Sequence, residues 1–153
     1  GVIAINKIMK DAIIADPEFK NGEYDIDKIK QNGLRGLEIA RMLGFLGYLS
    51  PTTFDKKFGR DYLKTDGMFE LFGRFQVESY LEYNGANFPK WFDPLSYIYI
   101  LKAISLFDLS RGYVSLKDAL SHITDRLHLI SFKGDTLFYP EEMKKIKKEM
   151  DNL

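Results

Sequence analysis

Residues 34–49, LRGLEIARMLGFLGYL, decide how this chain is built. The segment is apolar on nearly every side, which is typical of a helix that lies in an interior. Gly44 and Gly47 are three residues apart, and they leave a bare patch against which another backbone could pack closely. We therefore predict a buried helix here.

A second helix is predicted before this segment, at residues 2–15. Its apolar side chains recur at helical spacing, and Pro17 ends the pattern because it restricts the residue in front of it. The stretch between the two helices, residues 17–33, is polar and contains two glycines, which indicates a surface connector with a short helical turn near residues 26–29.

More helices are predicted after the apolar segment, at residues 50–58, 74–85, 93–109 and 115–123. Ser50 is a candidate N-cap with a proline after it, and Gly59 is expected to end that helix. Gly85 is expected to cap the next helix, and Ser115 to begin the last of the four.

The character of the sequence changes at Arg126. Residues 127–132, LHLISF, form an apolar run of strand length, and an acid-bearing loop and the helical stretch 141–150 follow it. That order is part of an α/β layer, whereas everything before it is helical. The predicted fold class is therefore mainly α, with one strand, acid loop and helix at the C-terminal end.

Composition excludes several classes of function. Twenty-two basic and 22 acidic side chains give a net charge of zero, so no overall field attracts nucleic acid or an anionic membrane. There is no cysteine and there are two histidines, so no metal site is expected. No apolar run approaches the roughly 20 residues of a membrane span, and no signal peptide is recognisable. We expect a cytoplasmic protein.

Arg41 is the first candidate site residue, because it lies in the middle of the apolar helix. A buried guanidinium needs an anion, which is either an internal carboxylate in a structural salt bridge or the carboxylate of a ligand. Tyr48 is seven residues further on, two helical turns, and so projects from the same face. Arg41 and Tyr48 could share a pocket.

Asp135 is the second candidate, since it follows the strand-like run and a glycine. Ligands and catalytic groups collect at the carboxyl ends of strands in open α/β sheets. The carboxylate could orient a histidine, or it could be an ordinary turn aspartate. His122 and His128 are assigned structural roles.

Several segments together resemble the homoserine O-acetyltransferases and their succinyl-transferring relatives. In the order of that family they are NKIMKDAIIADPEF, GLRGLEIARMLGFLGYLS, FDKKFGR, FQVESYLEYNGANFPKWFDPLSYIYILKAISLFD and SFKGDTLFYPEEM. They cover most of the 153 residues, and the second and fourth are the most specific.

The resemblance implies an α/β-hydrolase enzyme of methionine biosynthesis, in which a Ser-Asp-His triad passes an acyl group from acyl-CoA to the hydroxyl of L-homoserine. Residues 1–125 then correspond to a helical lid, and residues 126–153 to a late strand, the acid loop and a helix of the core. Asp135 matches the triad acid, Arg41 the arginine that binds the substrate carboxylate, and Tyr48 the active-site tyrosine of the same helix.

The chain departs from the family pattern in two places. It has no G-x-S-x-G nucleophile elbow, and no histidine follows Asp135. We therefore expect a fragment that is inactive by itself, with the nucleophile and the catalytic histidine outside it. A free-standing, non-catalytic helical interaction module is the alternative.

The expected partners are small molecules and a second copy of the chain. L-homoserine is the expected acceptor, acetyl-CoA or succinyl-CoA is a co-substrate, and no bound cofactor is expected. The resemblance also implies a homodimer built through lid helices, and neither nucleic acid nor a membrane is an expected partner.

Overall fold

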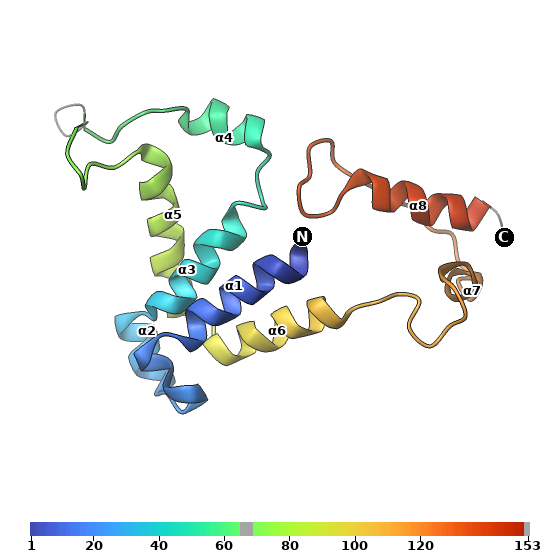
Figure 1. The fold of residues 1–153 in the computed structure, drawn as a ribbon, viewed down its shortest axis with the longest axis horizontal. Helices are drawn as coiled ribbons and strands as arrows, with labels where there is room; N and C mark the ends of the chain where they lie inside the picture. The colour runs from blue at the N-terminus through green and yellow to red at the C-terminus, as the bar shows by residue number, and fades with distance from the viewer. Residues whose placement is uncertain (65–68, 152–153) are drawn as a thin grey trace. The chain divides into compact units, whose positions relative to one another are not determined.

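The computed structural model describes residues 1–64 and 69–151, and helices make up 62% of these residues (Figure 1). Within those residues the one β-type contact is an isolated antiparallel bridge between Tyr62 and Phe75. The prediction of a mainly α fold is confirmed. The chain divides into two units, Gly1–Ser105 and Leu106–Leu153, and each is described separately below.

The first unit contains most of the helices. They are α1 (Val2–Ile14), the 3-10 helix η1 (Pro17–Gly22), α2 (Ile26–Asn32), α3 (Arg35–Phe45), α4 (Pro51–Phe58), α5 (Gln76–Asn87), the 3-10 helix η3 (Phe88–Lys90) and α6 (Pro94–Leu106). The connector predicted at residues 17–33 therefore holds two short helices rather than one turn. In Figure 1, α1 runs beside α3 and α6.

The start and end of α4 follow from local chemistry, as predicted. The Ser50 hydroxyl accepts a hydrogen bond from the Thr53 N–H at 3.2 Å, and Pro51 occupies the first helical position, where no N–H is needed. Gly59 has a φ of 50°, which favours glycine, and it ends the helix.

The backbone of α3 approaches α1 and α5 closely at two glycines, Gly36 and Gly85, and neither is one of the two glycines predicted for this role. A Cβ on Gly36 would lie 2.2 Å from the carbonyl oxygen of Ala12 in α1, and one on Gly85 would lie 3.0 Å from that of Glu38 in α3. Gly85 is thus an interior packing residue of α5, not its cap. The expected bare patch is wrong at Gly44, which faces side-chain atoms at an ordinary 3.6 Å.

The core of the first unit gathers around one side of α3. Its buried hydrophobic residues are Met9, Ile13, Phe19, Ile29, Leu34, Leu37, Ala40, Phe88 and Leu101. The prediction that the apolar segment is buried all round is wrong, because Ile39 and Leu46 are 39% and 49% exposed. Within this unit α3 packs mainly against α1 and α5, and also against η3.

One buried polar side chain ties α1 to α6. The amide of Asn6 donates to the Ser105 hydroxyl at 3.0 Å and to the Leu101 carbonyl oxygen at 3.4 Å. These bonds satisfy an amide that burial would otherwise penalise.

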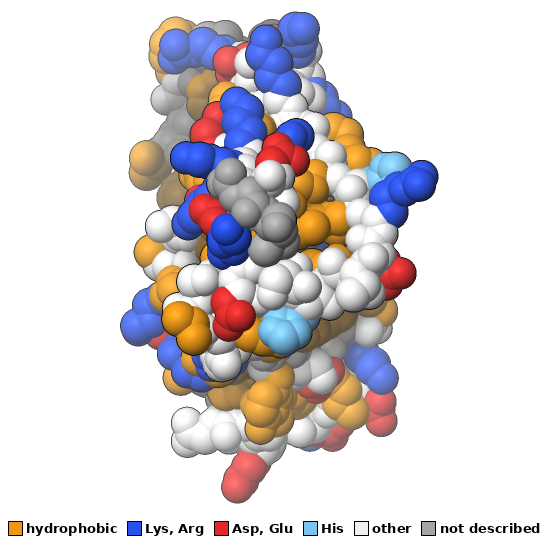
Figure 2. Space-filling view, turned by 90° about the vertical axis from the view of Figure 1, so that its right-hand side faces the viewer, with side chains coloured by type: hydrophobic (Ala, Val, Ile, Leu, Met, Phe, Trp, Pro, Cys, Tyr) orange, Lys and Arg blue, Asp and Glu red, His pale blue; other side chains and the backbone are white. Residues whose placement is uncertain are grey.

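The second unit contains α7 (Leu116–Ser121) and α8 (Pro140–Asp151), which pack against each other. The Ser115 hydroxyl caps α7 by accepting from the Asp118 N–H at 3.1 Å, as predicted. Both histidine side chains lie at the surface (Figure 2).

Residues 127–132, where a strand is expected, have no regular secondary structure. A strand is stabilised by hydrogen bonds to a neighbouring strand, and the described residues offer it no partner. The boundary expected between residues 125 and 126 concerns the division between lid and core of a complete enzyme, and it stays a prediction. No helix among the described residues is long and apolar enough to cross a membrane.

Candidate functional site

Arg41 and Tyr48 are brought together at the C-terminal end of α3. The Arg41 guanidinium donates a hydrogen bond to the Tyr48 hydroxyl at 3.0 Å. The helix does not continue for the two turns that their spacing predicts, because it ends at Phe45. Three successive backbone hydrogen bonds follow, each from an N–H group to the carbonyl oxygen three residues earlier. The last runs from Tyr48 to Phe45, and this turn keeps Tyr48 within reach of Arg41.

Aromatic rings, not a carboxylate, surround the Arg41 guanidinium. Its central carbon lies 4.6 Å from the ring centre of Phe45, 5.4 Å from that of Tyr48 and 4.4 Å from that of Phe88. A ring face attracts a cation through its quadrupole. Of the two anions considered for Arg41, an internal carboxylate is not found in the described part of the chain, where no ion pair includes it. The carboxylate of a ligand stays a prediction.

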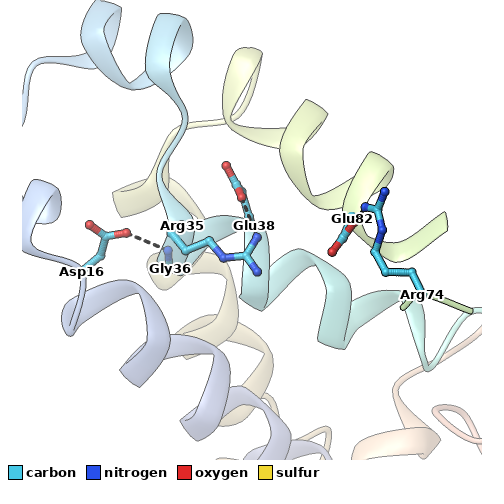
Figure 3. Close-up of polar contacts among 6 residues, drawn as sticks. All are labelled: Asp16, Arg35, Gly36, Glu38, Arg74 and Glu82. Atoms are coloured by element: carbon cyan, nitrogen blue, oxygen red, sulfur yellow. Dashed lines mark hydrogen bonds and ion pairs between the residues drawn. The ribbon is translucent and has the colours of Figure 1, made fainter. Parts of the chain in front are cut away.

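Two nearby arginines show the ordinary arrangement (Figure 3). Arg35 pairs with Glu38 at 3.0 Å, and Arg74 pairs with Glu82 at 2.5 Å. Both of these guanidinium groups already have a carboxylate partner from the chain. Arg41 differs because its charge is stabilised by rings and a neutral phenol, so it keeps the capacity to bind an added carboxylate.

An aromatic cluster around the buried Phe88 fixes one of these rings. Phe88 is 3% exposed and stacks on Phe92 with ring centres 4.8 Å apart, while Trp91 and Tyr97 meet it edge to face. Burial raises the pKa of the Tyr97 phenol, the nearby Tyr48 adds to the rise, and the positive charge of Arg41 opposes it. Tyr97 therefore belongs to the surroundings of the site.

Sequence reasoning did not identify Phe45, Phe88 or Tyr97 as parts of this site. Phe45 stands four residues after Arg41 in one helix, a spacing that places two side chains on the same face, so a local signal existed. Phe88 had no such signal, since a different element brings it to Arg41. Tyr97 packs against the hydrophobic core.

Asp135 forms a tight turn in the second unit. Its Oδ1 atom accepts hydrogen bonds from the backbone N–H groups of Leu137 at 2.9 Å and Phe138 at 2.8 Å. This is the turn-aspartate arrangement considered above, and it fixes the orientation of the carboxylate. Among the described residues no side chain or backbone group donates a hydrogen bond to Oδ2, so that oxygen can accept another donor.

The surroundings of Asp135 are open. A surface depression next to α8 is lined by Asp135 together with Lys133, Tyr139 and Lys144. Neither histidine of the chain is bonded to Asp135 in the described structure, and His122 lies instead against the ring of Tyr113, with ring centres 5.1 Å apart. Across residues 1–64 and 69–151, no group of three acidic, histidine or cysteine side chains is arranged to hold a metal.

Comparison of the sequence with known proteins identifies relatives of this chain. A scan against models of protein families gives no match. The chain is 76% identical over 152 residues to the homoserine O-acetyltransferase of Nautilia profundicola and 56% identical over 151 residues to that of Sulfurimonas autotrophica. The resemblance to the homoserine O-acetyltransferases is confirmed. A homoserine O-acetyltransferase from Geobacter sulfurreducens is 42% identical over 144 residues.

The similarity covers part of those proteins. The first two alignments include 99% of this chain but only 41% of each homoserine O-acetyltransferase. The crystal structure of homoserine O-acetyltransferase from Bacillus anthracis shares the fold, with a TM-score of 0.78 over 97% of this chain and 40% of that one. At 22% sequence identity, this last likeness concerns the fold alone.

Proposed function

We propose that this chain works as part of a homoserine O-acetyltransferase, which transfers the acetyl group of acetyl-CoA to the hydroxyl of L-homoserine. The observation that carries the proposal is the 76% identity to the Nautilia profundicola protein over 99% of the chain. No cofactor is needed for the transfer, because acetyl-CoA itself supplies the activated acyl group.

In this proposal Arg41 and Tyr48 bind the carboxylate of homoserine. The support is that the Arg41 guanidinium lies against three rings and a neutral hydroxyl, and that no carboxylate among the described residues forms an ion pair with it. A planar guanidinium suits bidentate hydrogen bonding to a carboxylate. Bound this way, homoserine is oriented by its carboxylate end, and its hydroxyl is free to react.

Asp135 is proposed as the acid of a Ser-Asp-His triad whose other two members lie in other parts of the enzyme. The serine attacks the thioester carbonyl of acetyl-CoA, CoA leaves as the thiol, and the homoserine hydroxyl then takes the acetyl group and restores the serine. Throughout, the acid holds the histidine in the tautomer that moves the proton. The turn at Asp135 supports this role, because it fixes one carboxylate oxygen and leaves the other available.

A hybrid enzyme tests the proposal directly. The matching segment of the Nautilia profundicola protein is replaced by this chain, and CoA release is measured with L-homoserine and with acetyl-CoA or succinyl-CoA as donor. We expect acetyl transfer at a rate similar to that of the unaltered relative. Succinyl transfer instead would favour the succinyltransferase alternative. A folded hybrid that transfers neither group would contradict the proposal and favour a non-catalytic interaction module.

A further inference from the structure

We propose that Phe45 and Phe88 are positioning residues for substrate binding, which hold the Arg41 guanidinium in place without neutralising it. The inference rests on the proposed function, because it concerns the same carboxylate site. It adds two residues whose role is to keep a half-buried cation stable and still available to an incoming carboxylate.

The physical problem is that a cation removed from water needs compensation. An internal carboxylate could supply it. Glu38 and Glu82 pair in this way with Arg35 and Arg74, although those two arginines are 62% and 53% exposed. Such a partner would also occupy the N–H groups that a substrate carboxylate must reach. An arginine with its own carboxylate would therefore be a poor receptor for homoserine.

Ring faces solve this problem because they act on a different part of the guanidinium. The central carbon of Arg41 lies over the rings of Phe45 and Phe88, at 4.6 Å and 4.4 Å from their centres. Interaction with the ring face stabilises the positive charge, while the N–H donors point outward in the guanidinium plane. One of those donors is used by the Tyr48 hydroxyl.

Both rings are held by their own neighbours, so they can act as fixed supports. Phe45 is in α3 itself and meets the ring of Tyr80 in α5 edge to face, at 5.8 Å. Phe88 begins η3, is itself buried, and is stacked on Phe92 in the aromatic cluster. The guanidinium is thus supported from two separate elements of the fold.

The test compares Phe45→Leu with the ring-preserving Phe45→Tyr in the hybrid enzyme. At saturating acetyl-CoA, we expect Phe45→Leu to lower kcat/KM for homoserine about 3- to 10-fold, the size expected for one cation–π contact. Phe45→Tyr should stay within about twofold of the unsubstituted hybrid. The burst of CoA release without homoserine should be unchanged in both, which also shows that each variant is folded.

A double-mutant cycle separates positioning from general packing. In an Arg41→Met background, Phe45→Leu should change kcat/KM by less than about twofold, because there is no cation left to hold. Phe88→Leu, measured the same way, gives an independent second arm.

The outcomes distinguish the two proposals. Equal losses in Phe45→Leu and Phe45→Tyr, or a loss that persists without Arg41, would overturn the positioning role and leave the proposed function intact. An unsubstituted hybrid that acylates no homoserine would overturn both.

Discussion

The phenol of Tyr24 donates a hydrogen bond to the carboxylate of Asp93, although 69 residues separate them. The same hydroxyl accepts from the Leu95 N–H at 3.1 Å, and the other Asp93 oxygen accepts from the Ser96 N–H at 2.6 Å. Together Tyr24 and Asp93 cap the N-terminus of α6. The pair thereby links the connector between η1 and α2 to α6, the last helix of the first unit.

Removing the Tyr24 hydroxyl should destabilise the fold. Tyr24→Phe deletes a hydrogen bond to a charged acceptor and one cap of α6, and because the pair is only partly buried we expect a loss of about 1 kcal/mol. Urea denaturation measures the free energy of unfolding. Tyr99→Phe is the matched control, since Tyr99 lies in α6, the helix that the pair caps, and is 69% exposed. An equal loss in both variants would show that the Tyr24 bond adds nothing.

The contribution of this pair should depend on pH in two windows. Burial acts to raise the pKa of Asp93, but the hydrogen bonds from Tyr24 and Ser96 lower it below the ordinary value of 3.8. Its stabilisation is therefore present above that value and lost as the pH falls through the lower pKa of the folded state. Burial and the bond to Asp93 raise the pKa of Tyr24 from 10.0 to about 12, so the stabilisation also fades as the pH rises between those values.

The measurement is the difference in free energy of unfolding between the wild type and Tyr24→Phe across the pH range. It should be flat between about pH 5 and about pH 9 and shrink on both sides. A difference that grows in acid would have the wrong sign for a lowered carboxylate pKa.

Two glycines of α3 should respond oppositely to alanine. Gly36→Ala places a methyl group 2.2 Å from the Ala12 carbonyl oxygen, so the backbones of α1 and α3 must separate, at a cost of about 2 kcal/mol or more. Gly44→Ala meets the Met9 and Tyr97 side chains at an ordinary 3.6 Å and should stabilise the helix by about 0.5 kcal/mol. Thermal and urea unfolding of both variants measure these changes in the free energy of unfolding. Similar losses of stability in the two variants would mean that α1 and α3 do not approach closely at Gly36.

Substitutions of Arg41 and Asp135 should impair different steps of the reaction in the hybrid enzyme. Arg41→Ala removes a charge-assisted bond worth roughly 1.5 to 3 kcal/mol, so acetyl transfer to homoserine should weaken while the burst of CoA release survives. Asp135→Asn favours the wrong histidine tautomer, which can cost on the order of 10⁴ in turnover, so the burst should nearly vanish. Rapid-mixing measurement of CoA separates them, and a normal burst in Asp135→Asn would show that another acid serves the triad.

The isolated chain should associate with itself. Mixed with acetyl-CoA, it should also show no burst of CoA release, because its sequence has no G-x-S-x-G nucleophile elbow. Ile3 and Ile8 of α1 are 65% and 58% exposed, and Ile104 of α6 is 52% exposed. Contiguous exposed apolar surface marks interfaces. Sedimentation at tens of micromolar, by order of magnitude, should give dimers or larger species, and Ile8→Glu should weaken them. A single monomeric species would speak against pairing through the lid helices.

The boundaries of α4 and the family resemblance were readable from the sequence by itself. Ser50, Pro51 and Gly59 bound α4 as predicted, because caps and proline act within one helical turn. Arg41 and Tyr48 were correctly placed together, although a tight turn rather than a longer helix joins them. The order of family segments likewise needs no coordinates.

The tertiary structure alone decided what surrounds those residues. The sequence could not show whether an internal carboxylate meets Arg41; in the folded chain Phe88 reaches it from a distant element, and the ring face stabilises the charge. Gly36 and Gly85, rather than Gly44, became the points of close approach, because packing between helices depends on which faces meet. Residues 127–132 have the composition of a strand, but a strand exists only where another strand pairs with it. Local signals extend over a few residues, whereas these outcomes depend on contacts between residues that the chain brings together only after folding.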